Sequence, residues 1–121
     1  MAKIKHIALK VEDQEKTADF YKKTFGMTEA WRGPVREDGK RAIYLTDGYI
    51  NMAVLPARGE REGIDHFGFQ VEDMEGTVST ATEAGAKGDS AKKPRDGRFA
   101  EVGVHDPAGQ LVDVSVHGWK A

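Results

Sequence analysis

The chain has 121 residues, of which 39% are hydrophobic and 31% are charged, and its formal net charge is -2. A charge this close to zero argues against a nucleic-acid-binding protein, which usually presents a strongly basic surface, and no apolar run approaches the roughly 20 residues of a membrane span. There is no cysteine, which excludes disulfides and thiolate chemistry; together with the absence of a long apolar stretch after Met1, this favours a cytoplasmic protein.

The first predicted element is a strand over residues 3–11, where polarity alternates along the chain. One face of this strand is large and apolar, and we expect it to pack on a helix. The other face is small and polar, which suits a cavity better than a dry core; it carries His6, Ala8 and Lys10.

A helix is predicted next. Asp13 is a good N-cap residue, and Gly26 can end the helix in a left-handed conformation. Short strand-like runs follow around residues 28–31, 41–46 and 49–55. The polar segment 56–63, which contains Pro and Gly, reads as a linker. The first 55 residues therefore predict a β-α-β-β-β module.

The second half repeats the first at a shift of 60 residues. His6 recurs as His66, and the run 11–13 (VED) recurs as 71–73. The repeat predicts a second strand and a second helix, the latter beginning after Asp73 and ending near Gly85. Strands are expected around 99–105 and 111–117, with a weak candidate at 87–91. We therefore expect a single domain over 1–121, with modules at 1–55 and 64–121.

The last predicted strand adds an acid to the two histidines. Alternation over 111–117 places Asp113, Ser115 and His117 on one face. A carboxylate within a buried strand is costly unless it is paired or bound to a cation. If this strand lines the same cavity as His6 and His66, two imidazoles and one carboxylate would leave open coordination positions on a divalent metal.

Other residues are candidates for lining the cavity. Judged by its distance from the Asp47-Gly48 turn, Asn51 is the expected counterpart of Asp113 in the first half, and it reads as a polar cavity residue rather than a metal ligand. Glu101 is a candidate catalytic acid, although an exposed glutamate is the simpler interpretation. Tyr44 and Ser115 are further candidates for the substrate pocket.

Several motifs together resemble the vicinal oxygen chelate superfamily. They are the openings HIALKVED (6–13) and HFGFQVED (66–73), the Phe20-Tyr21 pair before Gly26, and the turn 106–109 (DPAG) that precedes Asp113. The group includes glyoxalase I, extradiol dioxygenases, fosfomycin-resistance proteins, methylmalonyl-CoA epimerase and bleomycin-binding proteins. The resemblance implies an α+β fold of two paired β-α-β-β-β modules that form a curved mixed sheet around a cavity.

The resemblance also implies a site. The metal positions of the family fall on His6, His66 and Asp113, the last of which is usually Glu. The fourth ligand of glyoxalase I falls on Asn51, so a site of two histidines and one acid fits better. The expected function is a divalent-metal enzyme (Fe, Mn, Zn or Ni) of lyase, isomerase or dioxygenase type, acting on a small molecule that chelates through vicinal oxygens. The alternative is a metal-free antibiotic-binding protein. A homodimer is also implied.

Overall fold

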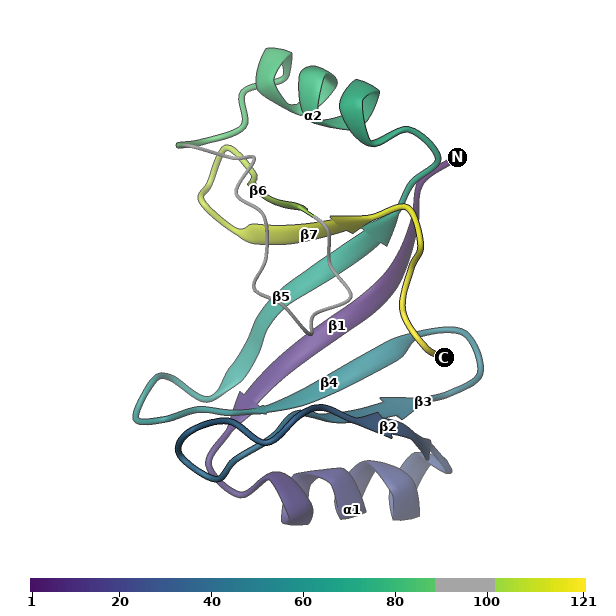
Figure 1. The fold of residues 1–121 in the computed structure, drawn as a ribbon, viewed down its shortest axis with the longest axis vertical. Helices are drawn as coiled ribbons and strands as arrows, with labels where there is room; N and C mark the ends of the chain where they lie inside the picture. The colour runs from purple at the N-terminus through teal and green to yellow at the C-terminus, as the bar shows by residue number, and fades with distance from the viewer. Residues whose placement is uncertain (89–101) are drawn as a thin grey trace. The chain divides into compact units, whose positions relative to one another are not determined.

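The computed structural model describes residues 1–88 and 102–121, which form two compact units (Figure 1). Unit 1 comprises Met1–Lys5 and His66–Trp119, apart from the undescribed segment, and unit 2 comprises His6–Asp65 and Lys120–Ala121. The chain therefore passes between the units at Lys5–His6, at Asp65–His66 and at Trp119–Lys120. Both histidines of the repeat lie directly at such a passage.

Unit 2 has the predicted β-α-β-β-β order. Its elements are β1 (Lys3–Val11), which begins in unit 1, then α1 (Gln14–Phe25), β2 (Thr28–Arg32), β3 (Ile43–Thr46) and β4 (Asn51–Pro56). The strands lie in the order β2-β3-β4-β1, with β1 and β4 parallel and the other pairs antiparallel. The strand and helix predictions for residues 3–55 are confirmed to within a few residues.

Helix α1 is defined by its two ends and by its buried face. The Asp13 carboxylate accepts a hydrogen bond of 3.1 Å from the backbone N–H of Lys16, and Gly26 ends the helix with φ +73°, a left-handed conformation that costs glycine little. The helix covers one face of the sheet, where the core of unit 2 consists of Ala18, Met27, Ile43, Leu45 and Val54. The opposite face of the sheet, which carries His6, is therefore available for a site.

Unit 1 is built from β5 (Gly63–Gln70), which begins in unit 2, α2 (Met74–Glu83), β6 (Val102–His105) and β7 (Leu111–Ser115). Strand β7 pairs in parallel with β5 and antiparallel with β6. Asp73 caps α2 by accepting a hydrogen bond of 3.1 Å from the Gly76 N–H. Of the weak strand candidate at 87–91, Lys87 and Gly88 lie outside any strand, and the remainder lies outside the described residues.

The sequence repeat extends to strand register. Residues of β4 pair with residues of β1 that lie 45 positions earlier, as in His6 with Asn51. Residues of β7 pair with residues of β5 at the same separation of 45, as in Phe67 with Val112. The paired positions of β1 and β4 therefore correspond to positions 60 residues later in β5 and β7, so the two halves can be compared residue by residue where both strands are formed.

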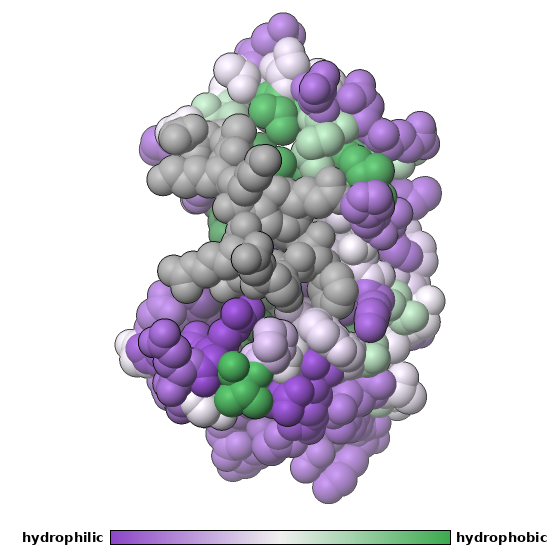
Figure 2. All heavy atoms as spheres, viewed as in Figure 1, coloured by the Kyte–Doolittle hydropathy of each residue, from purple (hydrophilic) through white to green (hydrophobic). Residues whose placement is uncertain are grey.

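The α+β prediction is confirmed by these helices and mixed strand pairs. Among the described residues, no helix combines the length and apolar character needed to cross a bilayer. The surface over α1 is mostly hydrophilic, whereas that near α2 mixes hydrophobic and hydrophilic residues (Figure 2). None of the residues of α2 is buried, which agrees with this mixed surface.

Candidate metal centre

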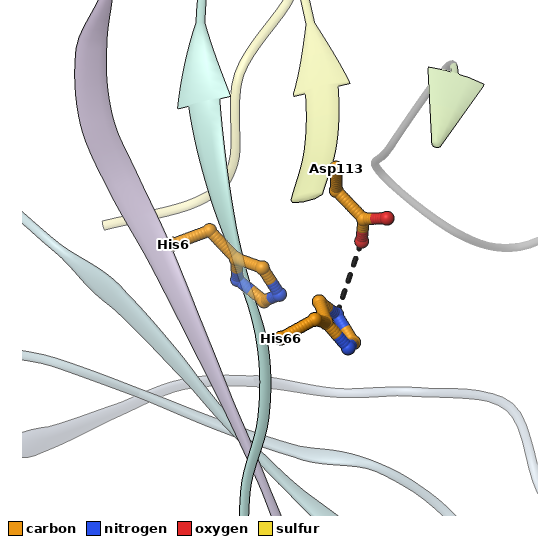
Figure 3. Close-up of side chains that lie close together, drawn as sticks. All are labelled: His6, His66 and Asp113. Atoms are coloured by element: carbon orange, nitrogen blue, oxygen red, sulfur yellow. Dashed lines mark ion pairs between the residues drawn. The ribbon is translucent and has the colours of Figure 1, made fainter. Parts of the chain in front are cut away.

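Unit 1 brings His66 and Asp113 together. The Nε2 atom of His66 on β5 lies 3.0 Å from Oδ2 of Asp113 on β7, and their side chains are 5% and 15% exposed. Figure 3 shows the carboxylate turned toward the imidazole, and it also draws His6 on β1. The pair explains how a carboxylate is tolerated within a mostly buried strand, since a shared proton or a cation offsets the desolvation of the charge.

The spacing of this pair also suits two neighbouring ligands of one ion. Metal–nitrogen and metal–oxygen bonds of about 2.1 Å place two donor atoms about 3.0 Å apart at a right angle and about 3.4 Å apart at the tetrahedral angle. The observed 3.0 Å falls at the short end of this range. A divalent ion could therefore bind between these two atoms with little movement of either side chain.

Small residues flank Asp113 on both neighbouring strands. Gly68 of β5 and Gly103 of β6 are its register partners. A Cβ atom built on Gly103 would lie 3.7 Å from Asp113 Oδ1 and 3.2 Å from Leu111 Cδ1. Neither glycine places a side chain beside the carboxylate, and the tip of the Leu111 side chain lies next to Gly103.

The corresponding face of unit 2 has a different character. The register counterpart of Asp113 is Ala53, and its partners on the neighbouring strands are Ala8 and Tyr44. Tyr44 stacks on Trp31 of β2, with ring centroids 5.5 Å apart and ring planes 19° from parallel. Unit 2 therefore presents small apolar residues beside an aromatic pair where unit 1 presents a carboxylate between two glycines.

His6 of unit 2 is held by an amide rather than by an acid. Its Nδ1 atom lies 2.9 Å from Oδ1 of Asn51, its register partner on β4. Both residues are buried, with exposed fractions of 4% and 0%. The Asn51 Nδ2 group donates a second hydrogen bond, of 2.6 Å, to the backbone carbonyl of Lys120. Every polar group of the Asn51 side chain is thereby engaged.

The predicted equivalence of Asn51 and Asp113 is wrong. Both strands begin directly after their turns, at Asn51 and at Leu111, so the register counterpart of Asn51 is Leu111. Asp113 is the third residue of β7, so its register counterpart is Ala53, the third residue of β4; the distance from a turn does not fix the register of a strand. The two turns also differ in their hydrogen bonds. The Asp47 carboxylate accepts from the N–H groups of Tyr49 and Ile50, whereas the Asp106 carboxylate accepts from those of Ala108 and Gln110.

The remaining candidates have separate environments. Ser115 is fully buried, and its Oγ accepts a hydrogen bond of 2.8 Å from the N–H of Gly118, which ties down the turn after β7; its predicted role in a substrate pocket stays a prediction. His117 is exposed and lies beyond the end of β7. Glu101, the candidate catalytic acid, lies outside the described residues.

Two basic side chains of unit 2, Arg32 and Lys10, are each paired with acidic side chains of the same unit. Arg32 makes ion pairs with Glu15 at 2.8 Å and with Glu29 at 3.0 Å. Its hydrogen bonds hold the pKa values of both carboxyl groups below their usual range and raise the pKa of Arg32 itself. Partial burial would lower the pKa of Lys10, but its hydrogen bond to Glu60 and the nearby charge of Asp65 outweigh this and raise it.

The model of the Glyoxalase/Bleomycin resistance protein/Dioxygenase superfamily matches residues 3–114. The chain belongs to this superfamily. The resemblance stated from the two HxxxxVED openings is thus confirmed. A comparison with curated proteins found no match. Each of His6, His66 and Asp113 offers one donor atom, an imidazole nitrogen or a carboxylate oxygen, of a kind that binds metal ions.

Several solved structures share the fold at low sequence identity. A hypothetical protein from Bacillus halodurans C-125 is 19% identical, with a TM-score of 0.73, over 93% of this chain and 92% of that chain. A methylmalonyl-CoA epimerase in complex with methylmalonyl-CoA and NH4+ is 20% identical, with a TM-score of 0.70, over 100% and 99%. A variant of the Streptomyces coelicolor epimerase in complex with 2-nitronate-propionyl-CoA is 22% identical, with a TM-score of 0.67, over 92% and 94%.

Two features of these sites could not be predicted from the sequence. The two glycines around Asp113 and the contact of Lys120 with Asn51 depend on which strands pair and in what register.

Proposed function

We propose that the protein is a divalent-metal-dependent enzyme whose metal is held by His6, His66 and Asp113. The observation that carries the proposal is the mostly buried His66–Asp113 pair, whose donor atoms lie 3.0 Å apart as two ligands of one ion would. Membership of the superfamily and the recurrence of His66 as His6 in the sequence repeat support the third ligand. Two histidines and one carboxylate leave positions open for substrate.

The proposed substrate is a small molecule that presents two neighbouring oxygen atoms. A bound divalent ion would polarise these oxygens and stabilise the negative charge that develops on them. Asp113 and His66 would fix the ion against β5 and β7. Because structural relatives include methylmalonyl-CoA epimerase, we favour an isomerase that moves a proton next to a carbonyl over a lyase or a dioxygenase.

Metal titration of the purified protein tests this proposal. We expect the metal-free wild type to bind about one equivalent of Fe, Mn, Zn or Ni by calorimetry, since ligands of this kind form a single site. His66→Ala should abolish this binding without loss of the fold, and His117→Ala, which changes an exposed histidine, is the matched control. A wild-type protein that takes up none of these ions would refute the metal site.

One observation favours the metal-free alternative. Trp31 stacks on Tyr44, and a flat aromatic ligand could stack on the Trp31 ring by displacing Lys120, whose Nζ atom lies 5.0 Å from its centroid, as expected of an antibiotic-binding protein. Ligand affinity that persists in the His6→Ala, His66→Ala double variant would favour this alternative, and affinity that disappears would favour the metal enzyme. The homodimer, the cytoplasmic location and the catalytic role of Glu101 stay predictions.

A further inference from the structure

We propose that Asn51 and the backbone carbonyl of Lys120 form a relay that sets the tautomer of His6. In this relay the neutral imidazole carries its proton on Nδ1 and its lone pair on Nε2. All three residues belong to unit 2. The tautomer follows from unit 2 alone, and only its consequence for metal binding rests on the proposed function.

The first step is the orientation of the Asn51 amide. A backbone carbonyl can only accept hydrogen bonds, so the atom of Asn51 that lies 2.6 Å from the Lys120 oxygen must be the donor Nδ2. The other amide atom, which lies 2.9 Å from His6 Nδ1, is then the acceptor Oδ1. The orientation is therefore fixed by the chemistry of Lys120 and not by a choice between two similar atoms.

The second step is the proton on His6. Since Oδ1 of Asn51 can only accept, the Nδ1 atom of His6 must donate, and it must carry a hydrogen. The neutral tautomer with its hydrogen on Nε2 alone would set two lone pairs against each other at 2.9 Å. With both residues buried, water cannot relieve that repulsion, and the tautomer is excluded.

The Lys120 carbonyl is itself anchored. The Lys120 Nζ atom lies 5.0 Å from the centroid of the Trp31 ring, a cation–π contact, and Trp31 stacks on Tyr44. The aromatic pair thus holds the exposed residue Lys120 over the sheet face that carries Asn51. The side chain of Lys120 secures the position, and its main chain supplies the acceptor.

The other half of the repeat lacks this arrangement. The register counterpart of Asn51 is Leu111, whose side chain has no polar atom, and His66 is held through Nε2 by Asp113 instead. The relay therefore belongs to His6 and is not a general consequence of a histidine on the first strand of each module.

A fixed tautomer matters for a metal ligand. A histidine that binds an ion through one ring nitrogen usually donates the N–H of the other to a neighbouring acceptor, and loss of that acceptor typically weakens metal binding 10–100-fold. Asn51 would play this part for His6, as a positioning residue that does not touch the ion.

The test is a nitrogen-15 NMR measurement of the His6 ring in the metal-free protein at about pH 8, where an ordinary imidazole is neutral. We expect the Nδ1–H tautomer in the wild type. Asn51→Leu, which copies the residue at the counterpart position, should convert His6 largely to the Nε2–H form. Deletion of Lys120–Ala121, two exposed residues, removes the carbonyl that accepts from Asn51 and should give a mixture of both tautomers of His6.

Lys120→Ala keeps the carbonyl and removes only the cation–π contact that steadies it, so His6 should stay mainly in the Nδ1–H form, with a smaller shift toward the Nε2–H form than the deletion gives. A wild type in the Nε2–H form would overturn the relay, and so would an Asn51→Leu variant, folded by its amide spectrum, that keeps the Nδ1–H form. In a metal titration we expect Asn51→Leu to bind 10–100-fold more weakly than wild type. A wild type that binds no metal but shows the Nδ1–H form would refute the proposed function and support the relay.

Discussion

Leu45→Ala is expected to lower the free energy of unfolding by about 3–4 kcal/mol. Leu45 is 0% exposed on β3 and lies in the core of unit 2, where it packs with Ile43 and Val54 beneath α1. Removal of three buried carbons costs about 2.4 kcal/mol at about 0.8 kcal/mol each. The cavity left behind adds to this, because the strands on either side relax only in part, and comparable Leu→Ala changes cost about 2.7–5.0 kcal/mol.

Urea denaturation followed by circular dichroism measures this loss. Ile64→Ala is the matched control, since Ile64 is 70% exposed and its truncation should change the free energy of unfolding by less than about 0.5 kcal/mol. The dependence of that energy on urea concentration should be similar in all three proteins. A loss below about 1 kcal/mol for Leu45→Ala would refute the close packing between α1 and the sheet.

Two further predictions concern the site and the surface charges. Gly103→Ala should be tolerated, because only the tip of the Leu111 side chain must shift. Gly103→Val should crowd Asp113 and weaken metal binding in a calorimetric titration, and unchanged binding would contradict the assignment of Asp113 as a metal ligand. Arg32→Met should raise the pKa of Glu15 toward its usual value, measured by NMR, and cost under about 1 kcal/mol. Because that pKa is lowered in the fold, this contribution is present above about pH 4.5 and is lost as the pH falls through the lowered value; a cost that persists in acid would contradict it.

Local patterns were sufficient to predict most of the elements. The alternation over residues 3–11, the cap at Asp13 and the left-handed Gly26 each depend on a few neighbouring residues, and each is found where expected. The second helix was harder to predict because its sequence has weak helix propensity, and it was predicted partly from the repeat.

The site was predictable in its residue types and less so in its pairings. The alternation of β7 placed Asp113 on a face with His66 as a possible partner, and the two are in contact. The counterpart of Asp113 was misplaced by two residues, because register is decided by hydrogen bonding between strands far apart in the chain. The contact of Asn51 with Lys120 spans 69 positions, and no local pattern in the sequence indicates it.

The two units exchange short segments of chain. Residues 1–5 belong with the unit formed mainly by the second half, and residues 120–121 belong with the unit formed mainly by the first half. A cut in the 57–62 linker would therefore give two fragments that each lack a piece of their own unit and carry a piece of the other. Such fragments should regain their structure only when mixed, so the protein is suited to a split-reporter design whose signal depends on reassembly, and the recovered His6–Asn51–Lys120 contact would mark correct reassembly.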